Sequence, residues 1–190
     1  KTTEERLPVF VWYFGGGLVE GNTAEMEFNG ERLARRGIVV VTINYRLNVF
    51  GFLAHPELTA ENPDFPTNFG HLDQIFGLQW VKRNIAAFGG DPNNITIGGQ
   101  SAGGRSVQVL LTSPLTKDLF HKAIVMSGIR YGGYGGVNAH GLNRTLSQAE
   151  SDGEDFFAHA GIKSLEEARK LDAQVLIEKF RDYAGIGSGL

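Results

Sequence analysis

A serine inside a glycine-rich turn is the residue best placed to do chemistry. Residues 99–103 are Gly-Gln-Ser-Ala-Gly, a G-x-S-x-G pattern centred on Ser101. The stretch "NITI" before the pattern predicts a strand, and "SAGGRSVQVLL" after it predicts a helix. Such a sharp turn strains the serine backbone and exposes the hydroxyl at a helix N-terminus, where negative charge is favoured. Gly99 and Gly103 lack a Cβ, so neighbouring backbone can come close. The pattern predicts a nucleophile at Ser101, and an ordinary glycine-rich turn is the alternative.

A second glycine-rich turn, "FGGGL" at residues 14–18, follows an apolar run at residues 8–14. An acyl-transfer site needs two or three hydrogen-bond donors aimed at the developing oxyanion, and losing one costs roughly 10²–10³ in rate. We expect one donor to be the N–H of Ala102 and the others to come from this turn. A flexible turn without a ligand is the alternative. The presence of both turns, each after an apolar run, disfavours it.

Strands and helices that alternate from residue 8 to residue 127 are predicted to position these turns. Strands are expected at 8–14, 38–43, 94–97 and 122–127, and helices at 28–36, 72–88 and 101–111. This alternation predicts an α/β fold with a mostly parallel sheet flanked by helices. The strand at 38–43 is expected to be fully buried. Residues 44–68, with three prolines, are expected to form an irregular surface segment.

The sequence changes in character after residue 128. A loop rich in glycine and aromatic residues is followed by helical patterns near 145–160, 164–170 and 172–183, with no further strand. We therefore predict that residues 1–128 form the core portion with both turns. Residues 129–190 are predicted to add a loop and helical segments to the same domain.

Composition argues against several classes of partner and cofactor. The net charge of the 190 residues is −3 and the basic residues form no stripe, so no nucleic-acid partner is expected. No apolar run approaches the ~18 residues of a membrane span and no signal peptide is recognisable, so no membrane association is expected. Cysteine is absent, no two histidines lie three or four apart, and no G-x-G-x-x-G occurs. We therefore expect no metal and no cofactor. The cellular compartment stays open.

Four stretches carry a more specific resemblance. They are "VFVWYFGGGLVEG", "VVVTINYRLNVFGFL", "NFGHLDQIFGLQWVKRNIAAFGGDPNNITIGGQSAGGRSV" and "LFHKAIVMSG", in that order between residues 9 and 128. Together they resemble the carboxylesterase/cholinesterase family (type B carboxylesterases) of the α/β-hydrolase fold. Residues 129–190 are similar only in general style. The resemblance implies a serine carboxylic-ester hydrolase with a nucleophile elbow at 99–103, acting on a small-molecule ester through an acyl-enzyme.

The resemblance also implies residue roles. Ser101 matches the nucleophile of the family. The positions whose backbone N–H groups form the oxyanion hole match Gly16, Gly17 and Ala102. Arg46 and Asp73 match a buried structural ion pair, which would pin residues 44–52 to the helix at 72–88.

Two departures from the family pattern bear on the substrate. Phe14 stands where many members have histidine, and cholinesterases also carry an aromatic residue there. Gln100 stands where many members have glutamate, so a carboxylate beside the serine is absent and neutral esters are expected rather than cationic ones. The side chains expected to bind substrate are Phe14, Leu18, Gln100, Tyr131 and Tyr134. Aromatic acyl esters, such as hydroxycinnamates, are one substrate class that they suggest.

The histidine that must take the serine proton is not evident among the five in the chain. The α/β-hydrolase order is serine, then acid, then histidine, which leaves only His140 and His159. Neither follows a late strand, so both are expected to be surface histidines. The resemblance places the acid and the histidine far downstream. We therefore expect this chain to be about a third of a larger enzyme, with the missing upstream and downstream segments as its partner.

A non-catalytic role is the rival hypothesis. Some members of the family are adhesion proteins that have lost the nucleophile, and a chain without the base could be an interaction module or an inactive fragment. Retention of Ser101 together with both glycine turns favours the enzyme.

Overall fold

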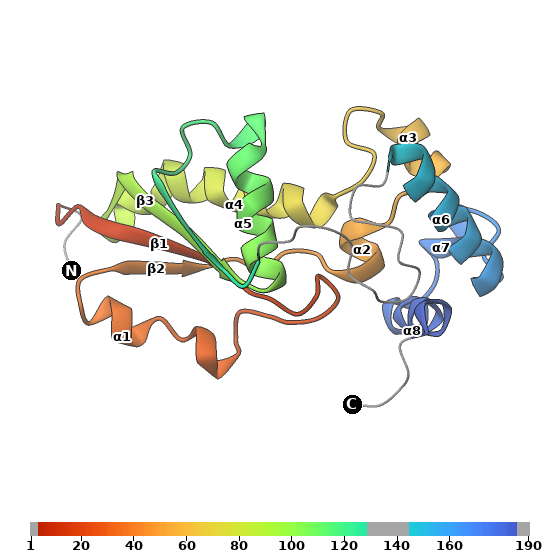
Figure 1. Cartoon of the computed structure of the whole chain (residues 1–190), viewed down its shortest axis with the longest axis horizontal. Helices are drawn as coiled ribbons and strands as arrows, with labels where there is room; N and C mark the ends of the chain where they lie inside the picture. Colours follow the sequence, from red (N-terminus) through yellow and green to blue (C-terminus); the bar gives the residue numbers. More distant parts are fainter. Residues whose placement is uncertain (1–3, 129–144, 186–190) are drawn as a thin grey trace. The chain divides into compact units, whose positions relative to one another are not determined.

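A four-stranded parallel sheet carries both glycine-rich turns (Figure 1). The structure is a computed structural model that describes residues 4–128 and 145–185. These residues form two compact units: residues 4–47 with 70–128, and residues 48–69 with 145–185. The sheet belongs to the first unit.

The strands are arranged in the order β2-β1-β3-β4, all parallel. Their bounds are β1 Leu7–Tyr13, β2 Val39–Thr42, β3 Gly90–Gln100 and β4 Lys122–Met126. β1 and β3 are therefore neighbours, and their register pairs Val11 with Ile97 and Tyr13 with Gly99. Because parallel strands end at the same edge, the chain leaves β1 and β3 side by side. The predicted α/β fold is confirmed, and β3 is longer than the expected 94–97.

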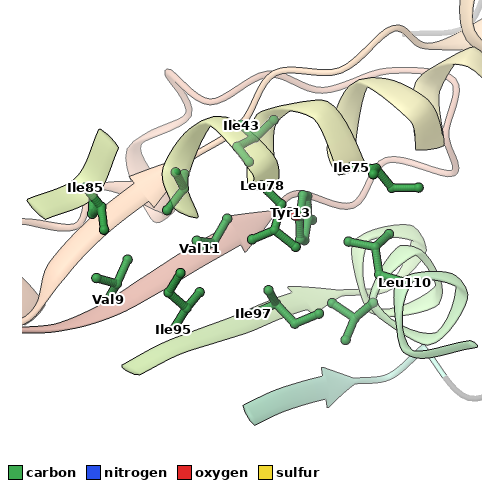
Figure 2. Packing of buried hydrophobic residues seen from close by; sticks show 12 residues of the cluster. Val9, Val11, Tyr13, Ile43, Ile75, Leu78, Ile85, Ile95, Ile97 and Leu110 are labelled. Carbon is green, nitrogen blue, oxygen red and sulfur yellow. The ribbon is translucent and has the colours of Figure 1, made fainter. Parts of the chain in front are cut away.

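Helices α4 (Phe69–Asn84) and α5 (Ala102–Thr112) cover one face of the sheet. Figure 2 shows side chains of both helices against those of β1 and β3. Val9, Val11 and Tyr13 alternate along β1 on this face and are at most 1% exposed. The buried members of this core are Val9, Val11, Tyr13, Ile43, Ile75, Leu78, Val81, Ile85, Ile95, Ile97, Val107 and Leu110.

The other face of β1 is also apolar, which explains its uninterrupted hydrophobic run. Phe10 and Trp12 alternate with the core residues, and the Trp12 ring lies 5.9 Å from that of Phe28. Phe28 belongs to η1 (Met26–Phe28), which precedes α1 (Glu31–Ala34). The single helix expected at 28–36 is therefore a short α1 with a 3-10 turn before it.

Two expectations about residues 38–68 were wrong. β2 is only partly buried along its length, because within the described residues it pairs on one side, with β1. The segment expected to be irregular contains α2 (Asn48–Phe52) and α3 (Pro56–Glu61). α3 has Pro56 at its first position, and the His55 ring accepts from the N–H of Glu57 at 3.2 Å. Proline at a helix start is favourable, so the prolines did not exclude a helix.

The second unit is helical within its described residues. Besides α2 and α3 it contains α6 (Leu146–Ala160), α7 (Leu165–Ala168) and α8 (Ala173–Ala184). Thr145 and Gln148 form a reciprocal capping box at the start of α6, and Gly161 ends it with φ 69°. Its buried core is Val49, Phe156, Phe157, Ala160, Ile162, Leu165, Ala168 and Leu176. The three helices expected in this region are confirmed.

The remaining short elements are η2 (Ile85–Phe88), after α4, and η3 (Pro114–Thr116), after α5. Across residues 4–128 and 145–185, no helix combines the length and the apolar character needed to cross a membrane.

The core between the sheet and α4 should dominate the stability of the first unit. Leu78 is fully buried there, so Leu78→Ala should lower the free energy of unfolding by about 2–5 kcal/mol. The matched control is Leu111→Ala on α5, because Leu111 is 51% exposed and should change stability by no more than about 0.5 kcal/mol. Chemical denaturation measures both variants, and equal losses would contradict this assignment of the core.

Candidate active site

Ser101 lies between β3 and α5 on a strained backbone. Its φ is 55° and its ψ is −121°, a combination that side-chain-bearing residues rarely adopt. Its N–H donates to the carbonyl oxygen of Met126, the last residue of β4, at 2.9 Å. The strained strand-to-helix turn expected from the sequence is therefore present. Ser101 is a partly exposed residue, and its hydroxyl has no hydrogen-bond partner among the described residues.

The start of α5 lies unusually close to the end of β1. A Cβ added to Gly103 would overlap the carbonyl oxygen of Tyr13 and lie 2.6 Å from that of Phe14. A Cβ on Gly99 would overlap the backbone of Gly103. Because the obstacles are backbone atoms, no side-chain movement can relieve them. Glycine at these positions is thus a steric requirement of the turn.

Gly15 brings the second glycine turn against the first. It comes two residues after the end of β1, and a Cβ built on it would lie 2.9 Å from the carbonyl oxygen of Gln100. The same Cβ would lie 3.2 Å from the Cβ of Ser101. The two turns therefore touch, as the adjacency of β1 and β3 requires.

The next two glycines shape the rest of this turn. Gly16 and Gly17 have φ values of 89° and 66°, in the left-handed region. The Gly16 carbonyl accepts from the N–H groups of Val19 at 3.0 Å and Glu20 at 3.1 Å, which closes the turn. Within the part of the chain that is described, the N–H groups of Gly16, Gly17 and Ala102 make no hydrogen bond.

Phe14, expected at the wall of a substrate pocket, has a buried ring that is 1% exposed. It stacks on Tyr45 with ring centroids 4.4 Å apart and an interplanar angle of 18°. The Tyr45 hydroxyl donates to the Phe14 carbonyl at 2.7 Å. The substrate contacts of Phe14 and of the partly buried Leu18 stay predictions. Tyr131 and Tyr134, the other two aromatic candidates, lie outside the described residues.

An open cavity of about 350 Å³ lies beside the Gly15–Gly16 turn. Its lining residues are Gly15, Gly16, Glu20, Gly21, Asn22, Glu25, Glu27, Phe28 and Gln100. Gln100 was expected to bind substrate, and its place here keeps that prediction open. The three glutamates give the cavity an acidic wall that the sequence analysis missed. Their position after the glycine turn was the available signal.

The Arg46–Asp73 pair predicted from the resemblance is present. The Arg46 backbone N–H and Nε donate to Asp73 Oδ2 at 2.9 and 2.8 Å, and Nη2 donates to Oδ1 at 2.8 Å. The pair joins the segment after β2 to α4, as expected. It is not buried in the described residues, because the Arg46 side chain is 52% exposed and that of Asp73 28%.

A buried polar chain links α4 to the start of α5. Gln74 Nε2 donates to Ser106 Oγ at 2.9 Å, and this hydroxyl donates to the Ala102 carbonyl at 3.1 Å. Gln74 Oε1 lies 3.0 Å from Nδ1 of His71. Burial, together with the nearby charge of Arg105, lowers the pKa of His71 below its ordinary value, despite the hydrogen bond with Gln74. The neutral imidazole is therefore favoured at this position.

The four described histidines each have a partner other than Ser101. The rings of His71 and His55 contact Gln74 and Phe157, respectively. His121 accepts the N–H of Ile95 at 3.1 Å. His159 lies 2.9 Å from Asp182 on α8 and is 47% exposed, in the unit that does not contain Ser101. His140 lies outside the described residues. The described histidines and acids also form no cluster of three or more that could hold a metal ion.

Adding a methyl group to Gly103 should disrupt the turn. We expect Gly103→Ala to lower the free energy of unfolding by about 3 kcal/mol or more, because the new Cβ overlaps backbone. The control is Gly161→Ala, where nothing lies within 4 Å and only left-handed strain of about 1–2 kcal/mol is added. Chemical denaturation compares the two, and a smaller loss at Gly103 would argue against the close approach.

Acid should weaken the Arg46–Asp73 pair. Burial alone would raise the pKa of Asp73. The hydrogen bonds and charge of Arg46 lower this pKa by more than burial raises it, so the net pKa lies below its ordinary value. The resulting stability is present above the unfolded-state pKa of about 3.9 and is lost as pH falls through the folded-state pKa. Asp73→Asn should therefore cost about 1 kcal/mol at pH 7, given the partial exposure, and less at pH 3.

Denaturation at both pH values measures this difference. Glu31→Gln is the control, since Glu31 pairs with Arg35 on an exposed helix surface and should matter little at either pH. An equal loss for Asp73→Asn at both pH values would contradict the electrostatic explanation.

Comparisons with known proteins place this chain in a family. The model of the Carboxylesterase family matches residues 1–153. The chain is 44% identical over 151 residues to fumonisin B1 esterase of Sphingopyxis macrogoltabida, covering 77% of this chain and 26% of that protein. It is 48% identical over 128 residues to para-nitrobenzyl esterase of Bacillus subtilis, covering 67% and 26%. It is 50% identical over 129 residues to liver carboxylesterase 1 of Oryctolagus cuniculus, covering 67% and 22%.

Solved structures agree with these sequences. A PNB esterase structure superposes with a TM-score of 0.81 at 38% identity, covering 96% of this chain and 37% of that one. The carboxylesterase EST55 of Geobacillus stearothermophilus gives a TM-score of 0.79 at 38% identity, covering 98% and 37%. The chain spans about a quarter of the length of the curated relatives it matches. By its matched sequence and its partial α/β-hydrolase fold, this chain belongs to the carboxylesterase family.

Proposed function

We propose that the protein carrying this chain is a serine carboxylic-ester hydrolase. The contact between the two glycine turns carries the proposal: a Cβ built on Gly15 would lie 3.2 Å from the Cβ of Ser101, and Ser101 is a partly exposed residue. A candidate nucleophile and unpaired N–H groups thus share one edge of the sheet. Membership of the carboxylesterase family supports the same reaction.

The proposed reaction begins when the Ser101 hydroxyl oxygen attacks the ester carbonyl carbon while an imidazole takes its proton. The carbonyl oxygen becomes an oxyanion, which the N–H groups of Gly16, Gly17 and Ala102 stabilise. The N-terminus of the 11-residue helix α5 adds a favourable field. The alcohol leaves with the proton and an acyl-enzyme remains. Water then attacks the acyl carbon, releasing the acid and restoring the serine.

The imidazole and its acid are proposed to lie outside these 190 residues. This proposal is supported by the four described histidines, each of which contacts a residue other than Ser101. Completing the site then requires the remaining segments of the enzyme.

Neutral esters, with aromatic acyl esters as one class, remain the proposed substrates. Gln100 supplies an uncharged amide at the cavity beside the turn. The carboxylates of Glu20, Glu25 and Glu27 around this cavity would repel anionic esters and attract cationic ones, so the proposed preference for neutral over cationic esters rests on Gln100, next to Ser101. Roles for Leu18, Phe14, Tyr131 and Tyr134 in choosing the acyl group belong to the same proposal.

Labelling with a fluorophosphonate probe and hydrolysis of p-nitrophenyl acetate test the proposed function in the full-length protein. We expect one adduct, mapping to Ser101, and its loss in Ser101→Ala. Turnover should fall by about 10⁴- to 10⁶-fold in this variant, because removing the nucleophile leaves only the contribution of the oxyanion hole and binding.

Ser127→Ala is the matched control. Ser127 directly follows β4 at the same edge of the sheet, is exposed, and also has a positive φ, 49°. This variant should keep both the adduct and the turnover. Wild-type protein that takes no adduct and hydrolyses no ester would refute the esterase and favour the non-catalytic module.

A further inference from the structure

We propose that Tyr45 is a positioning residue for the glycine turn at residues 15–17, an inference that rests on the proposed function for its catalytic consequence. Among the described residues, the hydroxyl of Tyr45 bonds neither to Ser101 nor to the N–H groups proposed to bind the oxyanion. It acts through the carbonyl of Phe14, the residue immediately before the three glycines.

The Tyr45 hydroxyl donates its hydrogen bond to the Phe14 carbonyl oxygen. The side chain is 6% exposed, and its O–H donates to the Phe14 carbonyl oxygen at 2.7 Å across 31 residues of sequence. Leaving either buried group without a partner would cost about 1–3 kcal/mol. The rings of the two residues also stack at 4.4 Å, so Phe14 is held both through its side chain and through its backbone.

Fixing the Phe14 carbonyl fixes the start of the turn. The carbonyl belongs to the planar peptide unit that includes the nitrogen of Gly15, so its orientation sets the direction in which the chain enters the turn. Gly15 then lies against Gln100 and Ser101. Three consecutive glycines have the widest backbone freedom of any residue type, so their geometry needs support from outside the turn. The Tyr45 bond supplies such support.

Tyr45 is itself anchored to the scaffold. The next residue, Arg46, is held by Asp73 of α4 through its backbone N–H and its guanidinium. On the other side, the N–H of Ile43 donates to the Trp12 carbonyl of β1. A continuous set of contacts thus leads from α4 through Arg46 and Tyr45 to the turn. The ion pair, which looks purely structural, becomes part of the support of the proposed oxyanion hole.

Loss of the Tyr45 bond should weaken the stabilisation of the transition state and leave the binding of the substrate unchanged. A displacement on the order of 1 Å of a catalytic group can cost about 10²-fold in rate. The N–H groups of Gly16 and Gly17 would gain their full strength only when the carbonyl oxygen becomes an oxyanion. Loosening the turn should therefore lower kcat and leave KM nearly unchanged.

Tyr45→Phe in the full-length protein tests this inference, because it removes the hydroxyl and keeps the stacked ring. We expect kcat for p-nitrophenyl acetate to fall about 10- to 100-fold with KM within about twofold of wild type. Tyr13→Phe is the matched control: Tyr13 is also fully buried, but its hydroxyl donates to the Gln74 carbonyl on α4, at 3.4 Å. Its kcat should stay within about twofold.

Hydrogen exchange gives a second readout that does not depend on turnover. Amides of the peptide covering residues 14–21 should exchange faster in Tyr45→Phe than in wild type and in Tyr13→Phe. Unchanged kcat with unchanged exchange would overturn the inference, as would an equal kcat loss in Tyr13→Phe. A raised KM at unchanged kcat would also overturn it, by indicating substrate contact. If the wild-type protein hydrolyses no ester, the proposed function fails, and exchange alone decides whether Tyr45 holds the turn.

Discussion

The close approach of α5 to the end of β1 is the constraint on which the rest of the site depends. The backbone of Gly103 lies so near the carbonyl oxygens of Tyr13 and Phe14 that no side chain fits between them. This approach is possible only because β1 and β3 are neighbours and end in register, with Tyr13 paired to Gly99. The turns that leave the two strands then have to meet. A serine after one strand and glycine N–H groups after the other become parts of one site.

The conformation of Ser101 is unfavourable by itself and is maintained by its surroundings. A side-chain-bearing residue at this φ and ψ costs about 1–3 kcal/mol. The neighbouring strand β4 binds its N–H through the Met126 carbonyl, and the buried contacts of Ile97 and Leu110 hold β3 and α5 on either side of the turn. Well-packed interiors resist displacement, so the local strain cannot relax without disturbing the core. The apolar core thus maintains a polar, strained turn.

Apolar packing positions the strands and helices, whereas polar contacts position the glycine turns. Strands and helices are placed by side chains such as Val11 and Leu78, which pack together between the sheet and α4. A glycine turn has no side chains to pack, so its position depends on backbone groups and on what binds them. The Tyr45 hydroxyl on one side and the Gln74–Ser106 chain on the other reach such backbone groups. Tyr45 lies 31 residues from Phe14, and Gln74 lies 32 residues from Ser106, so these bonds tie the turns to distant parts of the unit.

The sequence by itself determined the features that local pattern encodes. The alternating apolar residues of β1, the turn around Ser101 and the capping box of α6 follow from neighbouring residues, because backbone periodicity and turn chemistry are short-range properties. Only the tertiary structure decided the partial burial of β2, the helices within residues 48–61, the exposure of Arg46, the burial of the Phe14 ring and the acidic wall of the cavity. Each of these depends on which distant segment packs against the residue. Tyr45 illustrates the difference: its sequence neighbours give no hint of a bond to Phe14, because that bond exists only once β1 and the segment after β2 lie together.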